Sequence, residues 1–325
     1  MTRTGWLLFA AISLFWGIPY LFIKVAVREL DPTVVVLARV GIAAAVLVPL
    51  AAYRGALRPL RGHWPAIAAL ALVQIAGPFL LITYGEQHIA SSLASLLIAA
   101  DPLLVALLAL RLDPAERISG MRLVGLLIGL GGVVALLGLD VGGDRLKLVG
   151  AGLVLLAAAG YATGALLVKR CPYAALPSLG VVAAECAVGT LVLAPLALTR
   201  LPDRVPSPSV VASLAVLGLV CTALAWLIFF ALVAEVGASR GTVFTYVNPA
   251  VAVCLGVVLL GEPLDAATVA GFLLIILGSW LSTGGAVPPP LAYPFYPLRT
   301  RMWRRADRDE EATTRDVSRV LIRCD

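Results

Sequence analysis

Ten apolar stretches, each about 20 residues long, run along the chain with short polar connectors between them. A helix needs about 20 predominantly apolar residues to cross the hydrocarbon core of a bilayer. Backbone groups in lipid must be hydrogen-bonded internally, which favours helices for stretches of this length. We therefore predict an all-α membrane protein with ten transmembrane helices. The stretches are residues 6–26, 33–53, 64–84, 90–110, 122–139, 149–168, 178–198, 210–232, 239–260 and 266–286.

The composition favours the same environment. Hydrophobic residues make up 61% of the 325 residues, charged residues make up 14%, and the mean hydropathy is +0.98. A soluble domain is about half apolar and about a quarter charged. The five cysteines are widely spaced and form no CxxC or zinc pattern, so we expect neither a metal site nor a disulfide framework.

The orientation follows from the lysines and arginines near the ends of the stretches, because cytoplasmic loops carry an excess of them. The connector 54–61 and the segment 287–325 are rich in arginine. We predict a multi-pass protein of the cell (inner) membrane with both termini in the cytoplasm. The segment 287–325 begins with many prolines and continues with mixed charges, and we expect it to be a disordered tail.

The second half of the chain repeats landmarks of the first half. Asp101-Pro102 matches Asn248-Pro249, and in each half an acidic residue and two glycines follow the proline. A unit of five spans must enter the membrane upside down when it is repeated, and inverted repeats with interrupted spans are typical of secondary transporters. We therefore predict two inverted five-helix repeats, residues 6–139 and 149–286. The matched acidic residues and glycines, 146 residues apart, are Glu116 and Glu262, Gly125 and Gly271, and Gly132 and Gly278.

These segments together resemble the EamA-type family of the drug/metabolite transporter superfamily. The resemblance is carried by "LFWGIPYLFIKVAV", "ASSLASLLIAADPLLVALLA", "GASRGTVFTYVNPAVAVCLGVVLLGEPL" and "VAGFLLIILGSWL", and it covers about residues 6–284. It implies a ten-helix fold of two inverted repeats that moves small metabolites, often outward. The first repeat departs from the family pattern, because it ends in "LRLDPAERIS" without Leu-Gly-Glu and carries a charged residue, Asp101, before its proline.

Asp101 is the first candidate for a functional residue. A charge at the centre of a membrane helix costs about 2.5–3.5 kcal/mol on insertion scales, and Pro102 removes an intrahelical hydrogen bond. Both are tolerated where a helix faces protein or a wet cavity. We therefore weigh two roles for Asp101. It binds a cationic group or a coupling proton in a central cavity, or it forms a buried structural pair with Arg39.

Arg39 and Glu185 occupy equivalent positions in the two repeats, each inside its span. They are candidates for gates or anchors on either side of the cavity, or for structural residues that snorkel or pair with a loop arginine. Aromatic side chains suit amphipathic or zwitterionic substrates, although most aromatics in membrane proteins pack or lie at the interface. The remaining candidates are Trp16, Tyr20, Tyr84, Tyr161, Trp226 and Asn248, with Pro102 and Pro249 as helix breaks.

Enzymatic chemistry finds no support in the sequence. His63 and His88 are the only histidines, and no HExxH, Walker A or dinucleotide-binding motif is present. We predict a secondary active transporter, an exporter of small amino-acid-like or amphipathic metabolites, without a cofactor and without nucleic-acid binding. The alternative is a non-transporting membrane sensor or assembly partner on the same fold. The expected partners are a small-molecule substrate and the bilayer, and a coupling proton and a homo-oligomer are left open.

Overall fold

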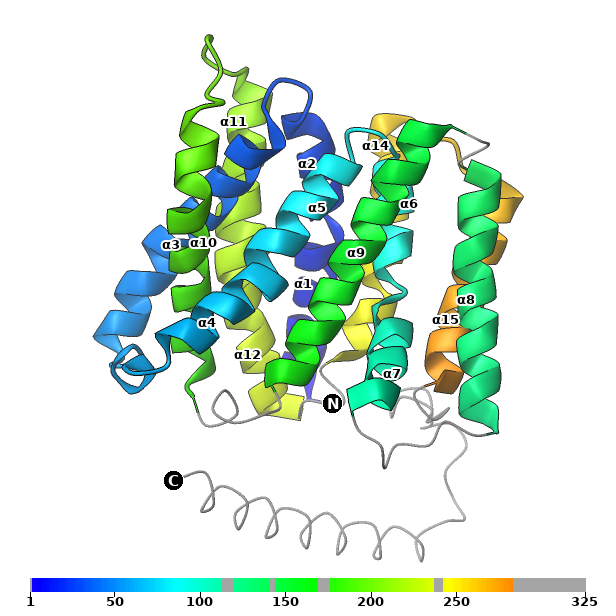
Figure 1. The fold of residues 1–325 in the computed structure, drawn as a ribbon, viewed down its shortest axis with the longest axis horizontal. Helices are drawn as coiled ribbons and strands as arrows, with labels where there is room; N and C mark the ends of the chain where they lie inside the picture. Colours follow the sequence, from blue (N-terminus) through cyan, green and yellow to red (C-terminus); the bar gives the residue numbers. More distant parts are fainter. Residues whose placement is uncertain (1, 113–119, 141–143, 169–175, 237–241, 283–325) are drawn as a thin grey trace, which may run out of the picture.

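The computed structural model describes residues 2–112, 120–140, 144–168, 176–236 and 242–282, and the regular elements in these ranges are all helical (Figure 1). The predicted tail, 287–325, lies outside the described residues. The helices of the first half are α1 (Arg3–Gly17), α2 (Pro19–Ala26), α3 (Pro32–Tyr53), η1 (Arg58–Leu60), α4 (Trp64–Ala71), η2 (Leu72–Ala76), α5 (Gly77–Gly85), α6 (Ser91–Ile98), α7 (Asp101–Leu112) and α8 (Met121–Asp140). Those of the second half are α9 (Arg145–Val168), α10 (Ser178–Leu198), α11 (Pro208–Ala215), η4 (Val216–Leu224), α12 (Ala225–Val236), η5 (Thr242–Tyr246), α14 (Asn248–Leu260) and α15 (Ala266–Ser282).

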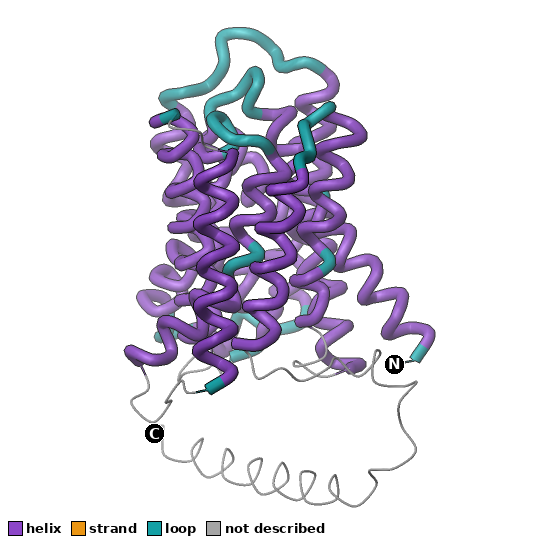
Figure 2. The backbone as a smooth tube through the Cα atoms, turned by 90° about the vertical axis from the view of Figure 1, so that its right-hand side faces the viewer, coloured by secondary structure: helices purple, strands orange, loops and turns teal. Residues whose placement is uncertain are grey.

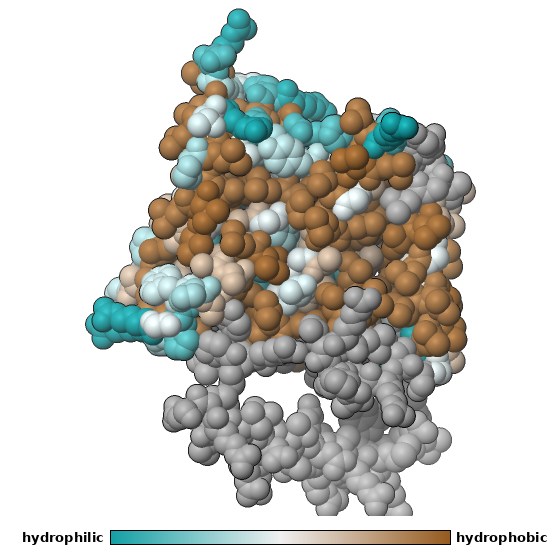
Figure 3. Space-filling model, in the orientation of Figure 1, coloured by the Kyte–Doolittle hydropathy of each residue, from teal (hydrophilic) through white to brown (hydrophobic). Residues whose placement is uncertain are grey.

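Seven of the described helices, counted with their breaks, are long and apolar enough to cross a membrane, and three further apolar helices are shorter. They run side by side, with connections at both ends of the bundle (Figure 2). A broad hydrophobic band covers the middle of the surface in Figure 3, and hydrophilic residues gather at its upper and lower ends. Large apolar side chains such as Leu191 and Val258 are exposed by 73% and 77%. Such a surface is suited to lipid rather than water.

Pro102 and Pro249, which the sequence predicts as helix breaks, each lie at the start of a new helix. The stretch 90–110 divides into α6 and α7, with a break at Ala99 and Ala100, and Pro102 is the second residue of α7. Pro249 holds the same place in α14. At a helix start the missing N–H of proline has no intrahelical partner to lose, and its fixed φ angle suits the first turn. Both prolines therefore lie at breaks between helices within their apolar stretches.

Two spans contain π-helical segments that the apolar stretches did not predict. η2 interrupts the stretch that begins with α4, and η4 interrupts the one that begins with α11. Within η4 the Thr222 hydroxyl donates a hydrogen bond to the carbonyl of Leu217, five residues earlier, at 2.8 Å. A π-helical segment changes which side chains face inward, and such segments are frequent at functional sites.

Helices from the two halves of the chain pack against each other. α3 lies antiparallel to α10, and α8 lies antiparallel to α15 at one edge of the bundle (Figure 1). The contact between α8 and α15 is built on glycines, because the backbones of Gly125, Gly129 and Gly132 approach those of Gly271 and Gly278. Small residues allow membrane helices to come this close. The two halves of the chain are therefore packed closely against each other.

Candidate functional site

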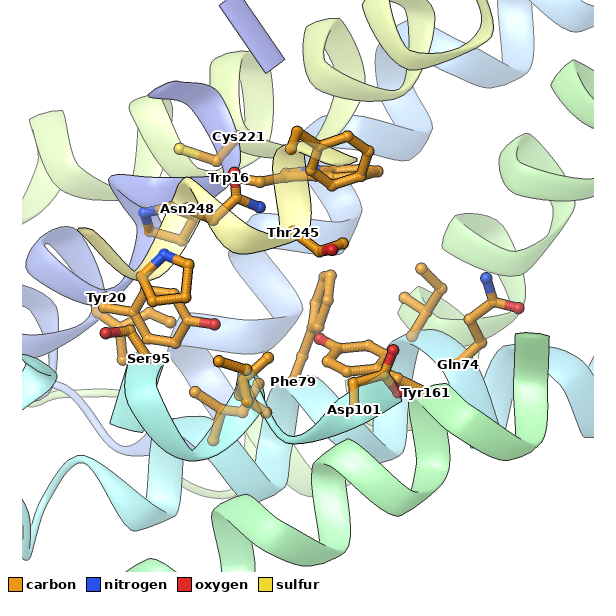
Figure 4. Close-up of a pocket in the computed structure, with 18 of the residues that line it drawn as sticks. Trp16, Tyr20, Gln74, Phe79, Ser95, Asp101, Tyr161, Cys221, Thr245 and Asn248 are labelled. Atoms are coloured by element: carbon orange, nitrogen blue, oxygen red, sulfur yellow. The ribbon is translucent and has the colours of Figure 1, made fainter. Parts of the chain in front are cut away.

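A cavity of about 230 Å³ lies at the centre of the bundle. This volume is far above the roughly 10–15 Å³ that one water molecule needs, so the cavity can hold a small organic molecule. Both halves of the chain contribute to its wall, with side chains from α1, α2, α3, η2, α5, α6 and α7 of the first half and α9, η4, α12, η5 and α14 of the second. Figure 4 shows these side chains converging from several helices on one space.

Arg39 supplies the positive charge of the cavity. Its side chain is only 6% exposed. Its Nε donates a hydrogen bond to the hydroxyl of Thr222 at 2.9 Å, and its guanidinium carbon lies 3.7 Å from the centre of the Phe79 ring. Within the part of the chain that the structure describes, no carboxylate lies within ion-pair distance of it. A guanidinium has five N–H donors, so Arg39 retains donors for an anionic group in the cavity.

Asp101 supplies a carboxylate to the same cavity. Its Oδ1 is buried and has no hydrogen-bond partner among the described residues. The structural pair with Arg39 that the sequence left open is not formed. A buried carboxylate oxygen without a partner is costly, and a cationic group or a proton placed beside it removes that cost.

Asn248, the repeat counterpart of Asp101, is engaged differently. With its amide turned so that the nitrogen faces the backbone, the orientation that satisfies both amide atoms, Asn248 donates to the carbonyls of Ser13 and Phe244, at 3.1 and 3.0 Å. These bonds tie α1 to the turn before α14. Asn248 lines the cavity, but its amide nitrogen serves the backbone next to Pro249, which favours the structural reading of this residue.

Six aromatic side chains form part of the remaining wall. Trp16 packs edge-to-face against Trp226, with ring centres 5.2 Å apart, and against Phe244 at 5.0 Å. Tyr20 and Tyr161 line the cavity, and each lies close enough to both Arg39 and Asp101 to interact electrostatically with them. The Tyr161 ring lies beside Asp101 in Figure 4.

Two of the residues singled out in the sequence lie away from the cavity wall. Glu185 is 1% exposed, and its neighbours Val181 and Ala184 pack against α4. Its Oε2 has no partner among the described residues, and the expected loop arginine is absent from the described surroundings. Tyr84 lies near the surface, where its hydroxyl accepts a 3.4 Å hydrogen bond from Arg200. The other candidates, Trp16, Tyr20, Arg39, Asp101, Tyr161, Trp226 and Asn248, with Pro102 and Pro249, are brought together.

The cavity also contains residues that the sequence interpretation missed. Gln74 lies on η2, and its amide oxygen is buried without a partner in the described residues. Its signal was available, because it is a polar residue in the middle of an apolar span. Phe79, Ser95 and Thr245 also line the cavity, but they carry no signal that separates them from packing residues. No group of three His, Cys, Asp or Glu side chains suited to a metal is found in the described ranges.

Comparison with known proteins agrees with this architecture. A sequence model of the EamA-like transporter family matches residues 3–138 and again residues 148–284. An uncharacterized transporter from Archaeoglobus fulgidus is 29% identical over 287 residues, which are 85% of this chain and 97% of the relative. A probable terminal-alkyne amino-acid exporter from Streptantibioticus cattleyicolor is 27% identical, over 79% of this chain and 86% of the relative. A solved protein crystal structure superposes with a TM-score of 0.62 at 22% identity, covering 85% of this chain and 96% of that one.

The chain belongs to the EamA-like transporter family, because the family match covers most of its length. It is an integral, multi-pass membrane protein, and its family is one of transporters rather than enzymes. The family predicted from the sequence is thereby confirmed.

Proposed function

We propose that this protein is a secondary active transporter that exports small zwitterionic, amino-acid-like metabolites. The observation that carries the proposal is the pairing of charges in one cavity: Arg39 has no carboxylate partner among the described residues, and Asp101 has a buried oxygen without a partner. A zwitterion offers both missing partners, with its carboxylate beside Arg39 and its ammonium group beside Asp101. The aromatic wall accepts an apolar side chain by contact and cation–π attraction. The name of the amino-acid exporter among the relatives agrees with this substrate class.

We propose that the chain crosses the membrane ten times as two inverted repeats, 6–139 and 149–286, with both termini in the cytoplasm. Three features support this arrangement: the double family match, the antiparallel pairing of α3 with α10 and of α8 with α15, and the shared placement of Pro102 and Pro249 at helix starts. Two halves of similar structure and opposite orientation can exchange inward-open and outward-open forms around one fixed cavity.

Purified protein in liposomes tests the proposed function. Proteoliposomes loaded with unlabelled L-phenylalanine are expected to take up labelled L-phenylalanine faster than protein-free liposomes, with saturation, because exchange across an alternating cavity is limited by the number of carriers. L-phenylalanine is the probe because it combines a zwitterionic head with an aromatic side chain. Equal fluxes with and without protein, for this probe and for other neutral amino acids, would favour the non-transporting sensor.

The Asp101→Asn substitution tests whether this carboxylate binds the ammonium group of the substrate or a proton. We expect L-phenylalanine exchange to fall about tenfold or more, because hydrogen bonds to charged groups contribute about 1.5–3 kcal/mol each. The exchange that remains is expected to keep the wild-type pH dependence, since an ammonium group rather than a proton occupies the site. Exchange rates measured over a pH series check this, with Asp203→Asn, an exposed loop carboxylate, as the control. A flattened pH profile would assign a proton to Asp101 and contradict the expectation.

A further inference from the structure

Glu86 is a buried acid that neither the cavity nor the packing of the core explains. It follows the last residue of α5, in the turn that leads to α6. Its side chain is 0% exposed, and both carboxylate oxygens are buried without a hydrogen-bond partner in the described part of the molecule. An ionised carboxylate in such a position lacks both water and donors, which is a costly state.

Two other charged groups lie next to Glu86, and both are satisfied by other partners. The Lys24 ammonium group donates to the backbone carbonyls of Glu86 and Ile89 rather than to the Glu86 carboxylate, the second at 2.7 Å. The Glu262 carboxylate accepts three hydrogen bonds at the start of α6, from Ser91 N and Oγ at 2.7 and 2.9 Å and from Ser92 N at 2.9 Å.

Glu262 is held as an anion by this geometry. Partial burial raises its pKa, but the hydrogen bonds from Ser92 and Ser91 outweigh that effect and hold the pKa below its usual value. The N-terminus of α6 also favours a negative charge. Among the described residues, the groups that interact electrostatically with Glu86 are Lys24, Glu262, Arg39 and the Tyr20 hydroxyl. α9 packs on α5 through Gly150 and Gly85 and brings no charged group to Glu86 among the described residues.

We propose that Glu86 is a proton-binding site of this protein and that its carboxylate carries a proton in the conformation described here. The step is the transfer of one proton from a hydronium ion to a carboxylate oxygen of Glu86, which breaks one O–H bond of the hydronium ion and leaves a water molecule and a neutral carboxylic acid. Of Lys24, Glu86 and Glu262, only Glu86 has side-chain polar atoms that are buried without a partner among the described residues, and a bound proton removes its uncompensated charge. Its electrostatic contact with Tyr20, which lines the cavity, links its charge to the substrate site. The coupling of this proton to solute movement rests on the proposed function.

Infrared difference spectroscopy of the purified protein tests proton binding without any substrate. We expect the wild type to show, at neutral pH, the C=O band of a protonated carboxyl group that is missing from Glu86→Gln. The band should return in Glu86→Asp and remain in Asp203→Asn. Glutamine matches the shape of glutamate, and size-exclusion profiles of all variants check that they fold. If the neutral-pH spectra of wild type and Glu86→Gln contain the same protonated carboxyl bands, Glu86 is ionised and the proposal is overturned.

Transport in proteoliposomes tests the coupling. A gradient of one pH unit supports up to about tenfold accumulation of L-phenylalanine at one proton per solute. We expect Glu86→Gln to keep exchange and to lose this gradient-driven accumulation. Accumulation that persists in Glu86→Gln would overturn the coupling. If the wild type moves no solute at all, the proposed function fails, and the infrared result alone decides whether Glu86 binds a proton.

Discussion

Replacing Arg39 with leucine is expected to slow L-phenylalanine exchange about 30-fold or more and to leave the protein at least as stable as the wild type. Removing one partner of a buried charge pair costs about 2–5 kcal/mol, and each 1.4 kcal/mol is about tenfold in affinity. Stability is retained because Arg39 is a buried charge with no carboxylate partner in the described residues, and exchanging a buried charge for an apolar side chain is often neutral or favourable.

The substrate itself provides the sharpest control for this variant. Phenylethylamine has the ring and the ammonium group of L-phenylalanine but no carboxylate, so its transport should change far less in Arg39→Leu. Arg204→Leu, an exposed arginine in a loop, should leave both solutes unaffected. Equal losses for the two solutes, or a loss of thermal stability in detergent, would instead assign Arg39 a structural role through Thr222 and Phe79.

Replacing Gly278 with valine is expected to lower the melting temperature in detergent by roughly 5 °C or more. A Cβ atom at Gly278 would lie 2.6 Å from the carbonyl oxygen of Gly125 and closer still to the backbone of Gly129. Backbone atoms cannot move aside as a flexible side chain can, so α8 and α15 must separate.

Gly131→Val is the matched control for that prediction. Gly131 is on α8, the helix that packs against α15, and a Cβ at this position meets nothing within 4 Å. Both variants place the same β-branched residue in a helix, so the difference between their melting temperatures isolates the contact between the two halves. Similar losses in both variants would show that helix propensity, rather than close packing, controls the effect.

The apolar stretches predicted the positions of the described helices well, because each span must be about 20 residues long and nearly free of charge. The helix starting at Pro32 and the one covering Ser178–Leu198 match the expected stretches within a residue or two. The π-helical segments were not predictable in this way. They leave the composition of a span unchanged and depend on how neighbouring helices pack, as for the Thr222 hydroxyl that bonds Leu217.

The sequence likewise identified some residues of the candidate site and missed others. Charge and proline inside apolar stretches identified Asp101 and Arg39, since both are costly in lipid. The hydrogen-bond partner of Arg39 could not be predicted from the sequence, because Thr222 is 183 residues away in the chain. Glu86 was overlooked since it lies in a short polar connector, where a glutamate ordinarily faces water. Only the packing of the turn after α5 shows that it is buried.

The direction in which each half crosses the membrane is the central claim of this account, and cysteine labelling measures it directly. Figure 1 places the starts of α1 and α9 at opposite ends of the bundle. In a background with the native cysteines replaced by serine, single cysteines at Thr2→Cys and Asp144→Cys report the two ends. We expect a membrane-impermeant maleimide to label Asp144→Cys in intact cells and Thr2→Cys only after the membrane is opened. Labelling of both positions from the same side would contradict the inverted arrangement and the alternating cavity built on it.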